Sequence, residues 1–183
     1  HPEFSENNWL YFTYSTRTEK GTNTALMRAK FDSEKLALSG HQQLYVGDVD
    51  AQGGRHFGSR IAFDHQGYVY FSIGDRGQRD VYPQDLSKDA GKIYRLHDDG
   101  QIPKDNPFVA NTKAKPAVYS YGHRNPQGLL FDMESKQLWA HEHGPRGGDE
   151  TNAIRKGANY GWPVISYGIN YSGTRFTDLT HKE

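Results

Sequence analysis

Short segments in which apolar and aromatic residues alternate with polar ones recur along the whole chain. Examples are WLYFTYS at 9–15, TALMRAKFD at 24–32, QQLYVGDV at 42–49 and GYVYFSI at 67–73. Such alternation over a few residues, between turns rich in Gly, Asp and Pro, predicts β-strands. No segment predicts a convincing helix, and the best candidate, residues 149–158, contains Thr151 and Gly157. The pattern therefore predicts an all-β fold.

The strands repeat in a larger unit. Residues 60–75 and 128–144 each contain a short apolar strand that ends in Phe-Asp, a polar turn and an aromatic-rich strand. GKIYRLHDDG at 91–100 and AVYSY at 117–121 bring the first unit to four strands, whereas TNAIRKG at 151–157 and WPVISYG at 162–168 would extend the second. Repeated four-stranded units are typical of a β-propeller, although a β-sandwich or a meander also shows strands at short intervals. We expect an incomplete blade over 1–50, a complete blade over 51–122 and a following, incomplete blade over 123–183.

Composition narrows the function classes. Lys+Arg and Asp+Glu both number 22, so the net charge of zero does not favour a polyanionic partner such as nucleic acid. No apolar run approaches the roughly 20 residues of a membrane span. Cysteine is absent, which excludes disulfides, thiolate metal sites and cysteine nucleophiles.

Two polar loops point to acid–base chemistry. GGRHFGSR at 53–60 carries His56 among glycines, and SIGDRG at 72–77 carries Asp75 directly after a strand. In a propeller both loops reach the same rim, so we expect the two side chains to meet. A carboxylate on one imidazole nitrogen fixes the tautomer and raises the basicity of the other nitrogen. The alternatives are a solvated loop histidine and an aspartate that bonds its own turn.

Two further loops concentrate polar groups that suit ligands. YGHRNPQGL at 121–129 places Arg124, Asn125 and Gln127 around a proline, a set that can bind an oxyanion or a quinone carbonyl. EHGPRGGDE at 142–150 is a Gly/Pro turn with two acids, which suits a hard cation such as calcium. An ordinary turn with solvated acids is the alternative. His141 and His143 alternate on a strand, but no third ligand for a transition metal is evident.

Four blocks of sequence carry a family resemblance. HFGSRIAFDHQGYVYFSIGD, GKIYRLHDDGQIPKDNP, YGHRNPQGL and GPRGGDETNAIRKGANYGWP resemble the glucose/sorbosone dehydrogenase family, most closely its bacterial soluble aldose sugar dehydrogenases. The similarity extends from about Trp9 to about Tyr171. It implies a six-bladed β-propeller, of which this chain covers about three blades.

The resemblance also implies an activity. Members oxidise aldose sugars to lactones with pyrroloquinoline quinone (PQQ) and calcium, by hydride transfer from the anomeric carbon to the quinone. They pass the electrons to an external acceptor. A periplasmic or secreted location follows from the same resemblance, and no signal peptide is visible at His1.

The family's catalytic roles fall on residues already singled out. By resemblance, His56 is the general base that takes the proton of the anomeric hydroxyl, and Asp75 orients it. Arg124 faces the quinone carbonyl and stabilises the developing oxyanion. Asn125 matches a quinone-binding asparagine, and His143 lies at a variable position near the cofactor.

The calcium roles fall on the glycine-rich turn and beyond it. By resemblance, the backbone carbonyls of Gly144 and Pro145 hold the cofactor calcium. Glu150 and the carbonyl of Tyr160 match ligands of a further, structural calcium in one branch of the family.

Some positions depart from the family pattern. Arg55 and His143 stand where the best-known glucose-oxidising members have Asp and Gln, so a strict glucose preference does not carry over. Family members are about twice as long as this chain, so we expect the chain alone to be inactive and to associate through open blade edges. Two other functions stay open, namely a non-catalytic calcium- or carbohydrate-binding propeller module and a calcium-dependent, lactonase-type hydrolase on the same fold.

Overall fold

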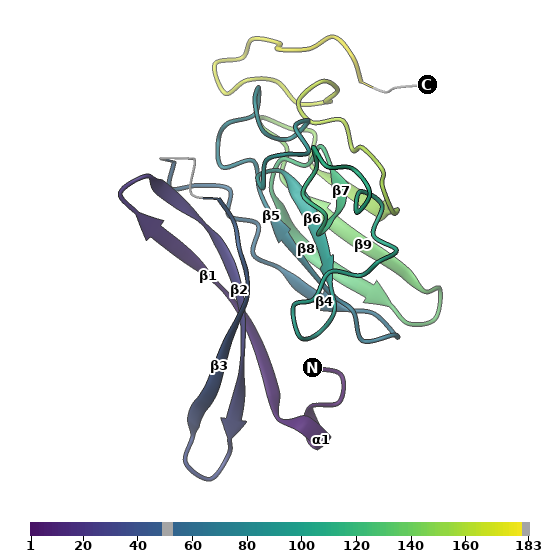
Figure 1. Cartoon of the computed structure of the whole chain (residues 1–183). Helices are drawn as coiled ribbons and strands as arrows, with labels where there is room; N and C mark the ends of the chain where they lie inside the picture. Colours follow the sequence, from purple (N-terminus) through teal and green to yellow (C-terminus); the bar gives the residue numbers. More distant parts are fainter. Residues whose placement is uncertain (49–52, 181–183) are drawn as a thin grey trace.

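Three antiparallel sheets follow one another along the chain in the computed structural model, which describes residues 1–48 and 53–180 (Figure 1). The first sheet has the order β1-β2-β3, the second β4-β5-β6-β7 and the third β10-β9-β8. The strands are β1 (Trp9–Thr18), β2 (Gly21–Asp32), β3 (Ala37–Val46), β4 (Ile61–Phe63), β5 (Val69–Ile73), β6 (Lys92–Leu96), β7 (Val118–Tyr121), β8 (Pro126–Asp132), β9 (Gln137–Glu142) and β10 (Glu150–Ile154).

The all-β fold is confirmed, and the four strands expected between residues 60 and 121 form one sheet. One helical turn of four residues, α1 (Phe4–Asn7), precedes the first strand, and the described residues contain no longer helix. One expectation was wrong: residues 162–168 form turns instead of a strand. Gly161 has φ +88° and Pro163 lacks a backbone donor, so this segment does not continue the ladder. The ring of six blades stays a prediction, and the boundary expected at residues 50 and 51 lies outside the described residues.

The second sheet is the centre of the structure because both of its faces are covered. Successive residues of β5 point to opposite faces. Phe71 packs in a cluster with Leu26 of the first sheet, while Tyr70 packs in another with Leu129 and Leu138 of the third. All five residues of β5 are therefore buried. Burying one large apolar side chain stabilises the fold by about 1.5–3 kcal/mol.

A buried carboxylate ties the first sheet to the second. Asp89, in the loop between β5 and β6, accepts hydrogen bonds from the hydroxyls of Tyr45 and Tyr94. Its other oxygen accepts the backbone N–H of Asp48 at 2.7 Å and lies 3.2 Å from the Lys115 ammonium. These contacts hold the end of the β5–β6 loop, which contributes to the site described below.

The third sheet has one covered and one open face. Leu129 and Leu138 face the second sheet and are buried, whereas the neighbouring Leu130 and Trp139 are 65% and 38% exposed. Leu130 and Trp139 are also paired across β8 and β9, so they form one apolar patch. The alternation of strand side chains thus leaves an apolar face without cover among the described residues.

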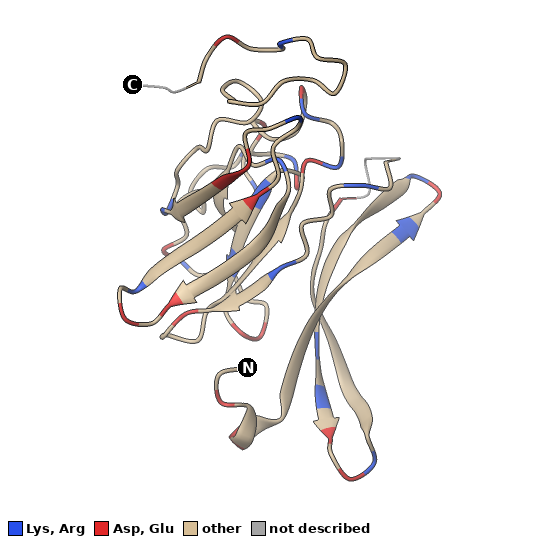
Figure 2. Cartoon of the chain, turned by 180° about the vertical axis from the view of Figure 1, so that it is seen from behind, with Lys and Arg blue, Asp and Glu red and all other residues tan. Residues whose placement is uncertain are grey.

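Charged residues are scattered over the strands and loops instead of gathering on one element (Figure 2). Both signs occur on the same loops, in keeping with the net charge of zero. In the described part of the chain, no helix has the length and apolar character that a bilayer crossing needs.

Candidate functional site

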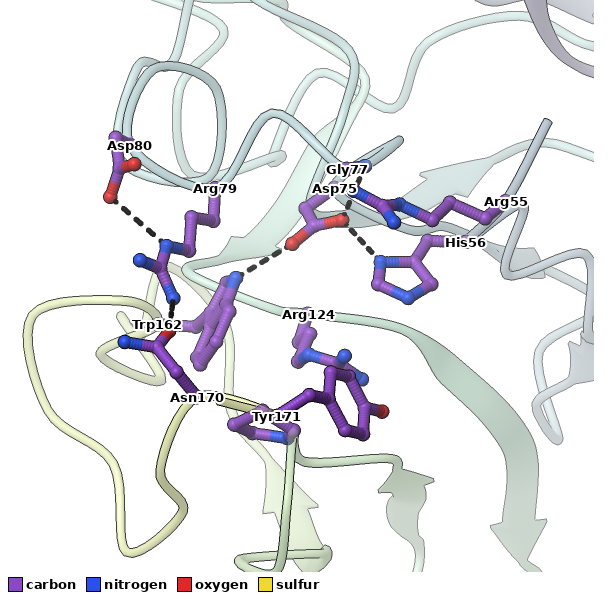
Figure 3. Close-up of a pocket in the computed structure, with 11 residues that line it drawn as sticks. Arg55, His56, Asp75, Gly77, Arg79, Asp80, Arg124, Trp162, Asn170 and Tyr171 are labelled. Atoms are coloured by element: carbon purple, nitrogen blue, oxygen red, sulfur yellow. Dashed lines mark hydrogen bonds and ion pairs between the residues drawn. The ribbon is translucent and has the colours of Figure 1, made fainter. Parts of the chain in front are cut away.

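Loops at one end of the second and third sheets line a cavity with a volume of about 440 Å³ (Figure 3). Both sheets and the C-terminal segment contribute to its wall. The lining residues are Arg55, His56, Asp75, Gly77, Arg79, Asp80, Arg124, Pro145, Trp162, Asn170 and Tyr171.

The structure brings His56 and Asp75 together, as the sequence predicted. His56 Nδ1 lies 2.6 Å from Asp75 Oδ1, and the Asp75 carboxylate is 1% exposed. The same oxygen accepts the backbone N–H of Gly77 at 2.7 Å. Asp75 therefore occupies Nδ1 and leaves Nε2 as the nitrogen that can take a proton from a ligand in the cavity.

The backbone around His56 is held in an uncommon conformation. His56 has φ +55°, in the left-handed region that non-glycine residues rarely adopt. Its carbonyl packs so closely on Gly74 that any side chain at position 74 would meet it. Such strain costs roughly 1–3 kcal/mol and persists only where the surroundings impose it, most often at functional sites.

Arg76 supplies much of that constraint. This fully buried side chain donates hydrogen bonds to the carbonyls of Gly53 and Arg55, which lie just before His56 in the same loop. Its guanidinium also lies 3.4 Å from the ring centroid of Phe57. The loop that carries His56 is thus fixed from the β5–β6 loop, which carries Asp75.

Arg124 reaches the cavity from the turn before β8. The backbone N–H groups of Arg124 and Asn125 both donate to Glu142 Oε2, at 2.5 and 3.2 Å. Arg124 Nη1 donates to the carbonyl of His143 at 2.9 Å. The backbone carbonyl of Arg124 accepts the N–H of Asp75 at 2.7 Å, so the two loops are joined directly beside the cavity.

Asn125 has a different neighbourhood from Arg124. Its buried side-chain oxygen accepts the backbone N–H of Gly58 at 3.1 Å, and the residue is not part of the cavity lining. In this structure Asn125 therefore holds the loop of His56, and a direct role at a quinone stays a prediction.

The residues predicted to bind calcium divide between two places. Pro145 lines the main cavity, whereas Gly144, Glu150 and Tyr160 line a much smaller cavity of about 10 Å³ beside it, together with His143. Burial raises the pKa of Glu150, and the nearby Glu142 acts in the same direction.

The glycine-rich turn itself is tightly packed. Gly144 donates its backbone N–H to Asp149 Oδ1 at 2.8 Å, and a side chain at position 144 would meet the backbone of Gly147 and Gly148. Among the described residues, no group of three or more His, Asp or Glu side chains has metal-holding geometry. A cation here would therefore depend largely on backbone carbonyls.

Several site residues were not predicted from the sequence. Trp162 lines both cavities and donates its indole N–H to Asp75 Oδ2 at 2.8 Å. Arg79 joins the β5–β6 loop to the C-terminal segment through Asn170 at 2.7 Å, next to Tyr171. Trp162 stands in the family-like GANYGWP block, which was the available signal. For Arg79 and Tyr171 no local pattern indicated the site, because long-range packing brings them there.

Comparison with known proteins identifies the family. The sequence matches the glucose/sorbosone dehydrogenase family over residues 1–183, so the chain belongs to this family. It is 39% identical over 178 residues to aldose sugar dehydrogenase YliI of Escherichia coli, covering 97% of this chain and 48% of that protein.

Solved structures show the same fold. The apo form of the soluble aldose sugar dehydrogenase of Escherichia coli superposes with a TM-score of 0.91 at 39% identity, over 95% of this chain and 50% of that one. The PQQ-bound aldose sugar dehydrogenase of Streptomyces coelicolor gives 0.76 at 32% identity, over 97% and 50%. The chain thus spans about half the length of these aldose sugar dehydrogenases.

Proposed function

We propose that this chain forms part of an enzyme that oxidises aldose sugars to lactones, with PQQ as the electron acceptor and calcium beside it. The observation that carries the proposal is the pair His56–Asp75, held at 2.6 Å in the wall of a cavity that Arg124 also lines. The similarity to a PQQ-bound aldose sugar dehydrogenase supports the choice of cofactor.

The cavity's residues fit such a cofactor. A volume of about 440 Å³ lies in the range of small-molecule sites. PQQ carries three carboxylates, and guanidinium groups are the side chains best suited to bind them. Arg55, Arg79 and Arg124 all line this cavity. Bound PQQ would supply the two-electron acceptor, which takes a hydride from the anomeric carbon.

His56 is the general base of the proposed reaction. Because Asp75 holds Nδ1, the free Nε2 takes the proton of the anomeric hydroxyl as the carbon is oxidised. The Asp75 carboxylate keeps the ring in this tautomer and stabilises the imidazolium that forms. The buried position of Asp75 keeps water from competing for the same oxygen.

Arg124 supplies positive charge on the other side of the cavity. Its guanidinium is anchored by the carbonyl of His143 and lies 5.5 Å from the ring centroid of Trp162. A fixed cation in a partly dry site stabilises negative charge that develops on a bound acceptor. No rearrangement of the arginine is then required during the reaction.

Calcium is the finer part of the proposal. The carbonyls of Gly144 and Pro145 would hold the cofactor calcium, and Glu150 with the Tyr160 carbonyl a second ion. Carbonyls and carboxylates are the ligands that calcium prefers. The main supports are the composition of this turn and the position of Pro145 in the cavity wall.

The remaining parts of the proposal concern the whole protein. We propose a ring of six four-stranded blades, with this chain as about three of them. A periplasmic or secreted location and an external electron acceptor stay predictions. The length of the aldose sugar dehydrogenase of Escherichia coli supports further blades, since this chain covers only 48% of that protein.

The test is aldose-dependent reduction of a dye by the full-length protein after addition of PQQ and calcium. Activity that requires both additions supports the proposal. A protein that binds sugar without turnover would instead be the non-catalytic module. One that hydrolyses lactones with calcium alone would be the hydrolase.

A further inference from the structure

Trp162 contacts both Asp75, which orients the proposed base, and Arg124, the proposed cation at the acceptor. Its indole N–H donates to Asp75 Oδ2 at 2.8 Å, and its ring faces the Arg124 guanidinium. Figure 3 shows the ring beside Arg124 with its nitrogen directed at Asp75. Trp162 and Arg124 are the two residues that line both the main cavity and the smaller one.

The side chain is itself firmly held. Trp162 is 7% exposed, and its ring meets Phe176 edge-on at 5.3 Å. Its backbone N–H donates to the carbonyl of Gly122 at 2.9 Å, and its carbonyl accepts Gln84 at 2.8 Å. The indole N–H is therefore a donor with a fixed position.

That donor completes the hydrogen bonding of the Asp75 carboxylate. Oδ1 accepts from His56 and Gly77, and Oδ2 accepts from Trp162. Because both oxygens of Asp75 accept hydrogen bonds, the carboxylate cannot rotate about the Cβ–Cγ bond without breaking a buried hydrogen bond. Leaving a buried acceptor without a partner costs roughly 1–3 kcal/mol.

We propose that Trp162 is a positioning residue: its indole N–H locks the Asp75 carboxylate so that Oδ1 faces His56 Nδ1. Trp162 lies in the segment that follows β10 of the third sheet, whereas His56 lies in the loop before β4 of the second sheet. A residue that follows the third sheet therefore positions a base that lies beside the second. The kinetic consequence rests on the proposed function, whereas the hydrogen-bond geometry does not.

The test compares two replacements at position 162 in the full-length enzyme. Trp162→Phe keeps an aromatic ring beside Arg124 and removes the N–H. Replacement of Trp162 by benzothienylalanine keeps the shape of the indole and removes only the donor, which covers the case in which the phenylalanine variant fails to fold. Trp139→Phe, on the exposed face of β9, is the matched control.

The first readout needs no cofactor. In protein purified without PQQ, the proton between His56 Nδ1 and Asp75 should give a downfield NMR resonance, which is assigned by its loss in His56→Ala. We expect this resonance to broaden or disappear in both Trp162 variants and to persist in Trp139→Phe. The other charged or titratable groups around the cavity, Arg55, Arg79, Asp80, Arg124 and Tyr171, are unchanged in all variants.

The second readout is turnover with PQQ and calcium. A base that is misplaced by a fraction of an ångström should lower kcat about 10- to 100-fold, with a much smaller effect on KM. Retention of the parent resonance in the benzothienylalanine variant would overturn the inference. If the enzyme oxidises no aldose at all, the proposed function fails while the resonance still decides the role of Trp162.

Discussion

His123 Nδ1 lies 2.8 Å from Glu142 Oε1, and both side chains are buried. The second oxygen of Glu142 accepts the backbone N–H groups of Arg124 and Asn125. On its other side, His123 Nε2 lies 2.9 Å from Ser120 Oγ. One carboxylate on β9 thus fixes the turn that carries the cationic side of the cavity.

Replacement Glu142→Gln should destabilise the fold and loosen that turn. An amide oxygen is a weaker acceptor than a carboxylate, and the amide N–H₂ would face a backbone donor or His123. We expect the free energy of unfolding to fall by about 1–3 kcal/mol, measured by urea unfolding. Glu134→Gln, in the exposed β8–β9 turn, is the control. Equal stability of the two variants would show that the Glu142 carboxylate does not hold the turn.

The sequence predicted the fold where local pattern decides it. The alternation of apolar and polar residues indicated a strand at each of β1 to β10. The expectation that the loops carrying His56 and Asp75 lie at the same end of the strands correctly placed the two side chains together. The prediction of a strand at 162–168 was wrong. WPVISYG is apolar enough for a strand, but the turns that it forms depend on Gly161 and on packing against the rest of the fold. The role of Glu142 was not predicted either. Glu142 is the last residue of β9, and no local pattern shows that its carboxylate accepts hydrogen bonds from the turn that carries Arg124. Trp162 meets Asp75 over 87 positions of sequence, a contact that only the tertiary fold creates.

Replacement His56→Ala in the full-length enzyme should lower kcat about 10²- to 10⁴-fold, the usual contribution of a general base. PQQ binding should persist, because Arg55, Arg79 and Arg124 are retained. Steady-state kinetics and PQQ titration measure the two effects separately. His41→Ala, on the exposed strand β3, should leave both unchanged. Near-parental turnover in His56→Ala would remove this residue from the mechanism.

Buried tyrosines should make the fold sensitive to alkali. Burial, reinforced by the neighbouring Asp89, raises the pKa of Tyr45 and Tyr94 well above 10.0. Both stay neutral in the folded chain while the unfolded chain ionises, so their contribution is complete below about pH 10 and is lost as the pH rises. Each should lower the free energy of unfolding by about 1.4 kcal/mol per pH unit above that point.

Urea unfolding between about pH 8 and about pH 11 measures this slope. Tyr94→Phe removes one ionisable group, so its stability should fall less steeply with pH than that of the parent, although it starts lower. Tyr14→Phe, at an exposed hydroxyl, is the control. Parallel curves for the parent and Tyr94→Phe would contradict the argument.

Replacement Gly144→Ala should weaken calcium binding in the full-length enzyme loaded with PQQ. The added methyl group would meet the backbone of Gly147 and Gly148, so the carbonyls of the turn must move. We expect the Kd for calcium to rise at least about tenfold, equivalent to about 1.4 kcal/mol, in a calcium titration. Gly54→Ala is the control, because a methyl group there meets nothing within 4 Å. An unchanged Kd in Gly144→Ala would place the ion elsewhere.

The open face of the third sheet should make residues 1–183, expressed alone, associate in solution. Leu130 and Trp139 are paired on this face, and exposed apolar patches beside sheet edges promote contact between copies. Leu130→Lys should weaken the association, as measured by sedimentation at several concentrations. Leu36→Lys, at a turn residue that is 80% exposed and distant in sequence from the third sheet, should not. A compact monomer at every concentration would show that the apolar face of the third sheet needs no cover. Tight binding of PQQ by that monomer would show that residues 1–183 alone form the cofactor site.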